Sequence, residues 1–196
     1  MKSVKLIPPA SSFFESMRDV GYTLETALAD IIDNSITARA TSIDIIAEID
    51  PQYTIGIVDN GHGMTHDELM EALRYASKDP RAHRGKEDLG RFGLGLKLAS
   101  LSQCRKLTVV TRKDGIFSSG IWDQSHVDKT KDWDLLIPDD ACSVKYADRI
   151  GNSGTLVLWE EIDALENDGE GDAVQGEFNR KLAEARSHLE LIFHRF

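Results

Sequence analysis

The chain has only two cysteines among its 196 residues and no long apolar run, and each shortage excludes a class of protein. Cys104 and Cys142 stand alone, without a CxxC pair or a Cys/His ligand spacing, which excludes a disulfide scaffold and a zinc module. We expect reduced thiols, although a single disulfide between them stays open. No apolar segment is long enough for a signal peptide or a membrane span, so we expect a soluble, intracellular, cytoplasmic protein without a membrane partner.

Basic residues are also scarce, since 23 Lys and Arg stand against 33 Asp and Glu, for a net charge of −10. Duplex nucleic acids are bound mainly through Lys and Arg on phosphates, so we do not expect this surface to bind nucleic acid. Residues 74–97 are the exception, with seven basic and three acidic residues and a local charge of +4. A basic island in an acidic chain indicates an anionic ligand, although a solvated loop fits the same pattern.

The length and the 41% of hydrophobic residues suit one globular domain with a full core. The order of helix, strand and hairpin signals along the chain predicts an α+β fold, a two-layer sandwich with helices on one face of a mostly antiparallel sheet. Apolar spacing predicts helices over about 22–38, 65–75, from 93 onward and 178–196, and strands near 43–48, 53–58, 107–111, 116–122, 132–137 and 154–160.

Four further segments complete this single domain of residues 1–196. They are an irregular N-terminal segment 1–20, a lid over 76–92, an acidic loop over 163–172 and a C-terminal helix over 178–196. The lid is predicted because a long segment of Gly, Pro and basic residues shows no periodicity. The chain ends inside the last predicted helix, so we expect it to be a piece of a longer protein.

Three polar residues share one face of the first predicted helix. Asp30, Asn34 and Thr37 are spaced i, i+4 and i+7, while Ile31 and Ser35 are expected to point elsewhere. An amide oxygen suits magnesium, and a carboxylate one turn away can orient or deprotonate a water molecule. A solvated face of an amphipathic helix fits the same spacing.

A second motif follows the strand that ends at Asp59. The carboxylate can accept a hydrogen bond from an exocyclic amine, and two glycines let the backbone turn close to a flat ligand that Met64 would cover. A simple turn is the competing interpretation, because Asn-Gly is a common turn dipeptide. The motif reads Asp59-Asn60-Gly61-His62-Gly63-Met64.

A third motif is rich in glycine and leads into the next predicted helix. Exposed amide groups at a helix start favour phosphate, and Arg91 and Lys97 add positive charge. The spacing is not that of a P-loop, and no strand precedes it as a dinucleotide fingerprint requires. The motif reads Gly90-Arg91-Phe92-Gly93-Leu94-Gly95-Leu96-Lys97.

Together and in this order, the motifs resemble those of the GHKL ATPases, a family that includes heat-shock chaperones, topoisomerase ATPase domains, MutL, sensor histidine kinases and MORC proteins. The resemblance covers roughly residues 20–160, and the motif sequences look closest to those of MORC-like and MutL-like members. Residues 29–35 look like the first family motif, 59–64 like the DxGxG motif, 90–97 like the second glycine box and 154–157 like the fourth motif.

The resemblance implies a Bergerat ATP-binding fold with ATP and Mg²⁺ as cofactors. Asn34 would hold the magnesium ion, Asp59 would bind the adenine amino group, and Thr155 would help to fix the adenine. Lys97 would contact a phosphate, and Ser77 or Lys78 would act from the lid. The expected nucleotide-binding residues are Asn34, Asp59, Gly61, Gly63, Met64, Ser77, Lys78, Gly90, Arg91, Phe92, Gly93, Leu94, Gly95, Leu96, Lys97 and Thr155.

Asp30 is the expected catalytic residue and also the main departure from the family pattern. Hydrolysing members usually have glutamate here, as the base that aligns the attacking water. Aspartate is one methylene shorter, and a small misplacement at a reacting centre costs about 10²-fold in rate. We therefore expect slow hydrolysis. Thr37, where such motifs often have aspartate, is expected to affect local packing.

Two other patterns are set aside as metal sites. His62 and His66 are four residues apart, but the turn expected between them prevents a shared helical face. The acids of residues 167–172 do not match the ligand positions of an EF-hand loop.

These observations predict a magnesium-dependent ATPase whose lid closure drives a conformational or dimerisation cycle, with ATP and ADP as ligands. One alternative is a nucleotide-sensing interaction module with little or no hydrolysis. Another is a kinase-type ATP-binding domain that acts on a separate partner, since no histidine precedes His62 as a phosphate acceptor. A generic α+β binding domain would have no affinity for ATP.

Overall fold

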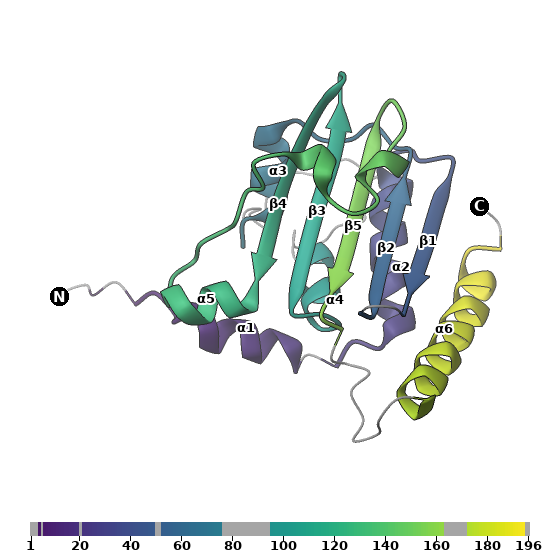
Figure 1. Cartoon of the computed structure of the whole chain (residues 1–196), viewed down its shortest axis with the longest axis horizontal. Coiled ribbons are helices and arrows are strands. Elements are labelled where there is room, and N and C mark those ends of the chain that lie inside the picture. The colour runs from purple at the N-terminus through teal and green to yellow at the C-terminus, as the bar shows by residue number, and fades with distance from the viewer. Residues whose placement is uncertain are drawn as a thin grey trace.

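A five-stranded antiparallel sheet forms the centre of the fold, in the order β1-β2-β5-β3-β4 (Figure 1). The computed structural model describes residues 4, 6–19, 21–49, 52–75, 95–162 and 172–194. The predicted α+β class is confirmed. The strands are β1 (Ile43–Glu48), β2 (Thr54–Asp59), β3 (Lys106–Lys113), β4 (Ile116–Asp123) and β5 (Gly154–Glu160).

Helices cover the rear face of the sheet as drawn in Figure 1, where α2 lies behind β2 and β5 and α3 lies behind β4. Helix α6 lies beside β1 and packs on α2, which also packs on α4. The helices are α1 (Ala10–Arg18), α2 (Leu24–Thr37), α3 (His66–Leu73), α4 (Gly95–Leu101), α5 (Gln124–Thr130) and α6 (Asp172–Ile192). Helix α6 begins earlier than the predicted residue 178.

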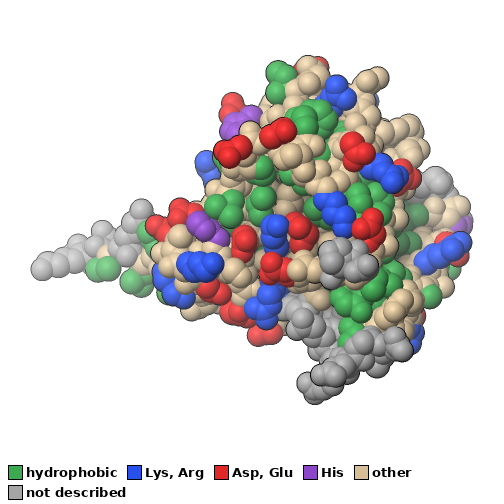
Figure 2. Space-filling model, in the orientation of Figure 1, with side chains coloured by type: hydrophobic (Ala, Val, Ile, Leu, Met, Phe, Trp, Pro, Cys, Tyr) green, Lys and Arg blue, Asp and Glu red, His purple; other side chains and the backbone are tan. Residues whose placement is uncertain are grey.

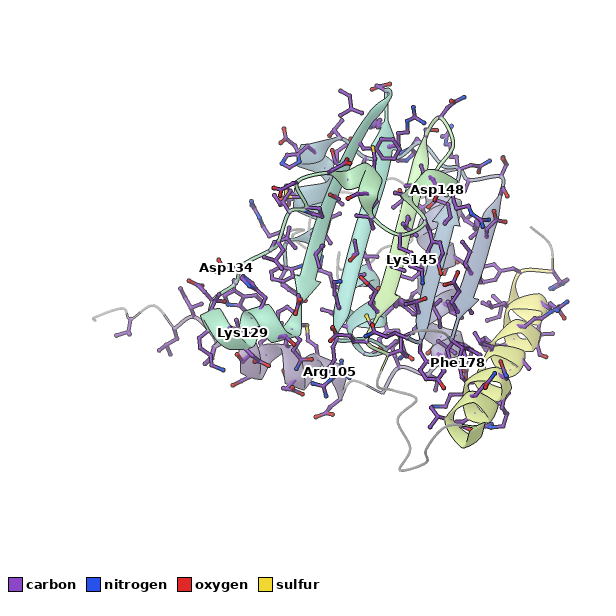
Figure 3. The ribbon with its side chains drawn as sticks, viewed as in Figure 1. Arg105, Lys129, Asp134, Lys145, Asp148 and Phe178 are labelled. Carbon is purple, nitrogen blue, oxygen red and sulfur yellow. The ribbon has the colours of Figure 1, made fainter. Side chains whose placement is uncertain are left out.

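The opposite face of the sheet is covered too, which the sequence analysis did not anticipate. Two short 3₁₀ turns, Ala141–Ser143 and Ala147–Arg149, cross in front of the strands near the labelled Lys145 and Asp148 of Figure 3. Ala147 and Ile150 pack there against a small cluster that includes Val58 and Leu156. Strands β2 and β5 are therefore buried on both faces, and this burial explains their nearly continuous apolar sequences.

Helix α1 lies in the segment that the sequence analysis treated as irregular. Ala10, Phe14 and Met17 are buried at helical spacing, and the ring of Phe14 lies 5.3 Å from that of Trp122. Burial of these side chains against the core stabilises a helix of nine residues that would be marginal alone. Its short length explains why spacing alone did not reveal it.

The prediction of a strand over residues 132–137 is wrong. Leu136 exchanges two backbone hydrogen bonds with Ile121 of β4, at 2.8 and 3.0 Å, and no longer ladder forms. Trp133 and Leu135 pack against the main core, so their alternation reflects packing. The indole of Trp133 donates to the carbonyl of Pro8 at 3.3 Å, which ties this segment to the N-terminal region.

The surface carries charges of both signs (Figure 2), and the two cysteines are unpaired. Figure 2 shows basic and acidic side chains interspersed over one face of the molecule. Cys104 is buried and Cys142 is exposed, and both are free thiols. None of the helices that the structure describes is long and apolar enough to cross a membrane.

Candidate functional site

The register of the sheet brings three polar residues into one row at the end of the strands. Asp59 of β2 is paired with Thr155 of β5, which is paired in turn with Thr111 of β3. Alternation along a strand puts Asp59 on the same face as Ile55 and Ile57, toward the helices. The row therefore lies at the boundary between the sheet and the helical layer, where Asp59 is only 7% exposed.

Both carboxylate oxygens of Asp59 are held by hydrogen bonds. The backbone N–H of Gly61 donates to Oδ1 at 2.8 Å, and Ser35 Oγ donates to Oδ2 at 3.1 Å. Burial raises the pKa of Asp59, and hydrogen bonds from Gly61, Ser35 and the backbone of Thr155 oppose that rise. The carboxylate is thus fixed in orientation before any ligand arrives.

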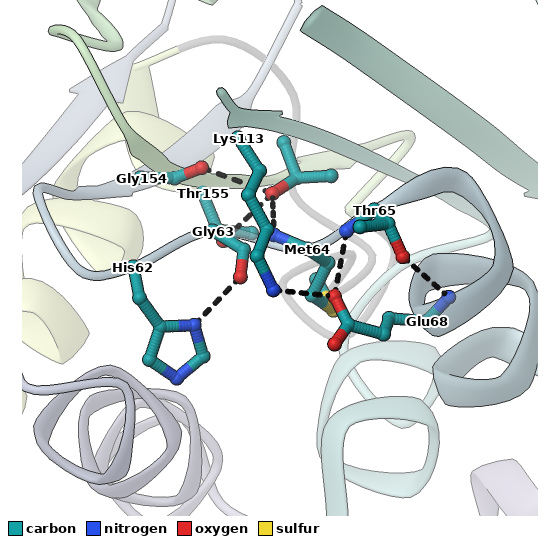
Figure 4. Close-up of polar contacts among 9 residues, drawn as sticks. His62, Gly63, Met64, Thr65, Glu68, Lys113, Gly154 and Thr155 are labelled. Carbon is teal, nitrogen blue, oxygen red and sulfur yellow. Dashed lines mark hydrogen bonds and ion pairs between the residues drawn. The ribbon is translucent and has the colours of Figure 1, made fainter. Parts of the chain in front are cut away.

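The turn after Asp59 packs backbone against backbone, which requires glycine at two positions. Gly63 has a φ of +65°, and a Cβ there would lie 2.1 Å from the carbonyl oxygen of Arg112. A Cβ at Gly154 would lie 2.0 Å from the carbonyl oxygen of Asp59. Thr111 Oγ1 joins the two loops, since it accepts from Met64 N–H at 2.8 Å and donates to the Gly154 carbonyl at 3.0 Å (Figure 4).

Gly63→Ala is expected to lower the free energy of unfolding by about 3 kcal/mol, through left-handed backbone strain and the clash with Arg112. Gly115→Ala is the matched control, because Gly115 has a φ of +79° and open space around its Cα. That control isolates the backbone strain, about 1 kcal/mol. Denaturant unfolding of both variants measures the difference, and equal losses would contradict the close approach.

A cavity of about 640 Å³ opens beside Asp59, between α2, the turn after β2, α3 and the start of α4. This volume suits a ligand of nucleotide size. Ile31, Ala38, Ala72 and Val157 contribute apolar walls. The residues predicted from the sequence that line it are Asn34, Asp59, Gly63, Met64, Gly95, Leu96 and Thr155.

The Asp and Glu residues in the described lining of this cavity have no Lys or Arg beside them in that lining. Asp59, Asp67, Glu68 and Glu71 line it, and the described lining residues include no lysine or arginine. Lys113 donates to Glu68 at 2.8 Å, and with the capping bonds of Thr65 it lowers the pKa of Glu68 to about 2 (Figure 4). The capping box predicted at Thr65 is therefore confirmed, and Glu68 stays ionised at the rim.

The three residues predicted on one face of α2 do not all reach the cavity. Asn34 and Thr37 are exposed and line it. Asp30 is half-buried beside it, where Oδ2 accepts a hydrogen bond from the Tyr22 hydroxyl at 2.9 Å. The same oxygen lies 3.7 Å from the position of a Cβ at Gly95, a lining residue.

Ser35 was wrongly separated from the ligand face of α2. Ser35 lines the cavity, and its one hydroxyl hydrogen has two acceptors within reach, Asp59 Oδ2 at 3.1 Å and the carbonyl of Ile31 at 3.3 Å. Helical spacing alone did not reveal this because the contact depends on where β2 ends relative to α2. A small polar residue within an apolar helix stripe was the available signal.

Lys97 is placed away from the cavity lining. Its side chain is fully buried, and Nζ donates to the carbonyls of Ala72 and Arg74 at 2.6 and 2.9 Å. Nζ also lies 5.7 Å from the ring centroid of Tyr75. These contacts tie the end of α3 to α4, and the phosphate contact of Lys97 stays a prediction.

Seven other predicted nucleotide-binding residues lie outside the described residues. Gly61 is described and donates to Asp59 from within the turn. The seven are Ser77, Lys78, Gly90, Arg91, Phe92, Gly93 and Leu94.

A magnesium ion at Asn34 would need ligands from the nucleotide. Within the described part of the chain, no group of three or more His, Cys, Asp or Glu side chains could hold a metal ion. The Asn34 amide is exposed at the cavity wall, so its oxygen can supply one hard ligand. This donor set fits an ion that arrives with phosphate oxygens.

Burial of Asp59 has a consequence for stability that depends on pH. Because its folded pKa is raised, its favourable contribution is present below the unfolded pKa and is lost as the pH rises through the folded pKa. We expect Asp59→Asn to become more stable relative to the wild type between about pH 4 and about pH 7. Denaturant unfolding at both pH values tests this, with exposed Asp44→Asn as a control that should show no such trend.

The fold and this site define an α+β domain of the Bergerat class, and sequence comparison assigns the family. The profile described as histidine kinase-, DNA gyrase B- and HSP90-like ATPase matches residues 22–155. The chain therefore belongs to this family of ATPases, which bind ATP. The resemblance to GHKL ATPases is thereby confirmed.

Several relatives share the central part of the chain. ATPase morc-1 of Caenorhabditis elegans is 30% identical over 95 residues, which are 48% of this chain and 11% of that protein. ATPase MORC2B of Mus musculus is 31% identical over 96 residues, 47% of this chain and 9% of the relative. DNA mismatch repair protein MutL of Colwellia psychrerythraea is 36% identical over 89 residues, 44% and 14% of the two chains. The match thus spans between 9% and 14% of these relatives.

Proposed function

We propose that this chain binds ATP with magnesium in the cavity beside Asp59 and hydrolyses it slowly. The observation that carries the proposal is the buried Asp59 carboxylate, which Ser35 and Gly61 hold in orientation at the floor of the cavity. A fixed acceptor in an apolar pocket selects a ligand with a matching donor, such as the adenine amino group. Thr155, the cross-strand neighbour of Asp59, would complete the adenine contacts.

The other end of the nucleotide would lie toward Asn34 and Gly95. Asn34 would supply a magnesium ligand from α2, and Gly95 opens α4 with backbone N–H groups that suit phosphate. Magnesium supplies positive charge to the phosphates when it is bound. Asp30, beside Gly95, would accept a hydrogen bond from the attacking water and align it.

The carboxylates of the cavity lining favour a role for magnesium and for the basic segment in this function. Four carboxylates line the described cavity and only Glu68 is paired with a lysine, Lys113, so an ATP phosphate chain would be repelled there without further cations. The predicted lid over 76–92 carries much of the basic island, and we propose that it closes over the nucleotide. Such closure would drive a conformational or dimerisation cycle.

The test is steady-state release of phosphate from ATP, measured with magnesium and with excess chelator. We expect slow release with magnesium and none with the chelator. A rate that is independent of magnesium would contradict the role of Asn34 and the charge argument.

A nucleotide-sensing module is the second candidate, and the position of Asp30 favours it. Asp30 is absent from the described lining of the cavity and is bonded to Tyr22. Tight ATP binding without turnover would select this function. In that case the bound nucleotide would act by shifting the protein between conformations.

A further inference from the structure

Tyr22 contacts Asp30, the predicted base of the site, and lies outside the four family motifs at 29–35, 59–64, 90–97 and 154–157. It lies two residues before α2, and its hydroxyl donates to Oδ2 of Asp30 at 2.9 Å. We propose that Tyr22 is a positioning residue for ATP hydrolysis, which fixes the Asp30 carboxylate beside Gly95. This inference rests on the proposed function, because it concerns the base of that reaction.

Tyr22 is itself anchored to the end of α4. The side-chain amide of Gln103, which is 3% exposed, donates to the backbone carbonyl of Tyr22 at 3.1 Å. Four residues earlier, Arg18 Nη1 donates to the carbonyls of Leu101 and Cys104 at 3.1 and 2.9 Å. Arg18 and Tyr22 are therefore both hydrogen-bonded to the region at the C-terminal end of α4.

The side chain of Tyr22 extends from that anchor toward the first residue of α4, where its hydroxyl bonds to Asp30. Asp30 Oδ2, its acceptor, lies 3.7 Å from the position of a Cβ at Gly95, the first residue of α4. The carboxylate is thus held near the point where the glycine-rich segment enters the helix.

The hydroxyl is suited to this role because it stays protonated. Burial, followed by the hydrogen bond and the negative charge of Asp30, raises the pKa of Tyr22 to about 12. A protonated phenol occupies Oδ2 as a donor and leaves Oδ1 to accept a hydrogen bond from water. Aspartate is one methylene shorter than glutamate and extends less far toward the water. A carboxylate held in one orientation by Tyr22 would offset part of that shorter length.

The test compares kcat and KM for ATP in Tyr22→Phe, which removes the hydroxyl and keeps the ring. We expect kcat to fall about 10-fold, as loss of a hydrogen bond to a charged group predicts, with KM unchanged. Combined with Asp30→Asn, the substitution should cause no further loss. Tyr53→Phe is the matched control, because its ring packs on Phe178 at 5.0 Å, away from the cavity, and should leave kcat unchanged.

A second measurement needs no turnover. Incorporation of 3-fluorotyrosine at position 22 gives a phenol whose ionisation is followed by fluorine NMR in the resting protein. Asp30→Asn should lower the pKa of that phenol, because the hydrogen bond and charge of Asp30 both raise it. Asp33→Asn, on the same helix, should lower it less.

These two measurements separate the inference from the proposed function. An unchanged kcat in Tyr22→Phe, or equal changes in KM and kcat that leave kcat/KM constant, would overturn the positioning role. An NMR titration insensitive to Asp30→Asn would overturn the contact itself. A wild-type protein that releases no phosphate but shows the NMR shift would overturn the hydrolytic function and the role of Tyr22 in it, with the Tyr22–Asp30 pair retained.

Discussion

Asp59→Asn is expected to weaken ATP binding about 100-fold. The carboxylate accepts from Ser35, from Gly61 and from the backbone of Thr155, and it has acceptor capacity left for a ligand donor. An asparagine amide would keep an acceptor for Gly61 and could present its NH₂ group to the ligand. The asparagine NH₂ group and the ligand amino group would then face each other as two donors. The hydrogen bond is lost and polar hydrogens stay unpaired in a buried site, which accounts for a loss of affinity of this size.

The control for this prediction is Asp44→Asn, an exposed aspartate on the neighbouring strand β1. It removes the same charge from the same sheet and should leave the affinity unchanged. Displacement of a fluorescent ATP analogue measures both variants. Because Asp59→Asn is expected to be well folded at neutral pH, a loss of binding in a cooperatively unfolding variant is attributable to the contact. Equal affinity of Asp59→Asn and wild type would contradict adenine recognition by Asp59.

Asp30→Asn is expected to reduce phosphate release at least about 100-fold while ATP binding is retained. Its carboxylate lies beside Gly95 and outside the cavity lining, so it contributes little to affinity. An amide is a poor acceptor for a proton and a weak partner for the attacking water. A measurement of kcat with KM separates this effect from lost binding.

Asp33→Asn provides the matched control on the same helix. Asp33 lies one turn from Asp30, is half-buried and is absent from the described cavity lining. Burial and the charge of Asp30 raise the pKa of Asp33, so the two carboxylates share one electrostatic environment. We expect Asp33→Asn to retain hydrolysis. Similar losses in both variants would indicate a general charge effect on α2 and contradict a base at position 30.

The sequence was most informative where function depends on adjacent residues. Asp59 and Gly63 belong to one short turn, and the structure places both on the cavity. Asn34 also lines the cavity, as its position on α2 predicted. In each case the secondary structure brings the residue to the site, so local spacing was sufficient.

Residues that join distant elements were not predictable from spacing. Thr111 reaches the site because β3 pairs with β5, and that pairing depends on the strand order of the whole sheet. Ser35 contacts Asp59 because α2 packs across the end of β2. Lys97 donates to carbonyls at the end of α3 and just after it, which lie far from it in sequence. Such contacts follow from tertiary packing, which one sequence does not specify residue by residue.

The central claim is that ATP binds with magnesium in the cavity beside Asp59, and calorimetric titration tests it most directly. Wild-type protein would be titrated with a non-hydrolysable ATP analogue in the presence of magnesium. The account predicts saturable binding of one nucleotide per chain, which weakens when magnesium is removed because carboxylates line the described cavity. A titration without saturable binding, performed on folded protein with magnesium present, would contradict the account.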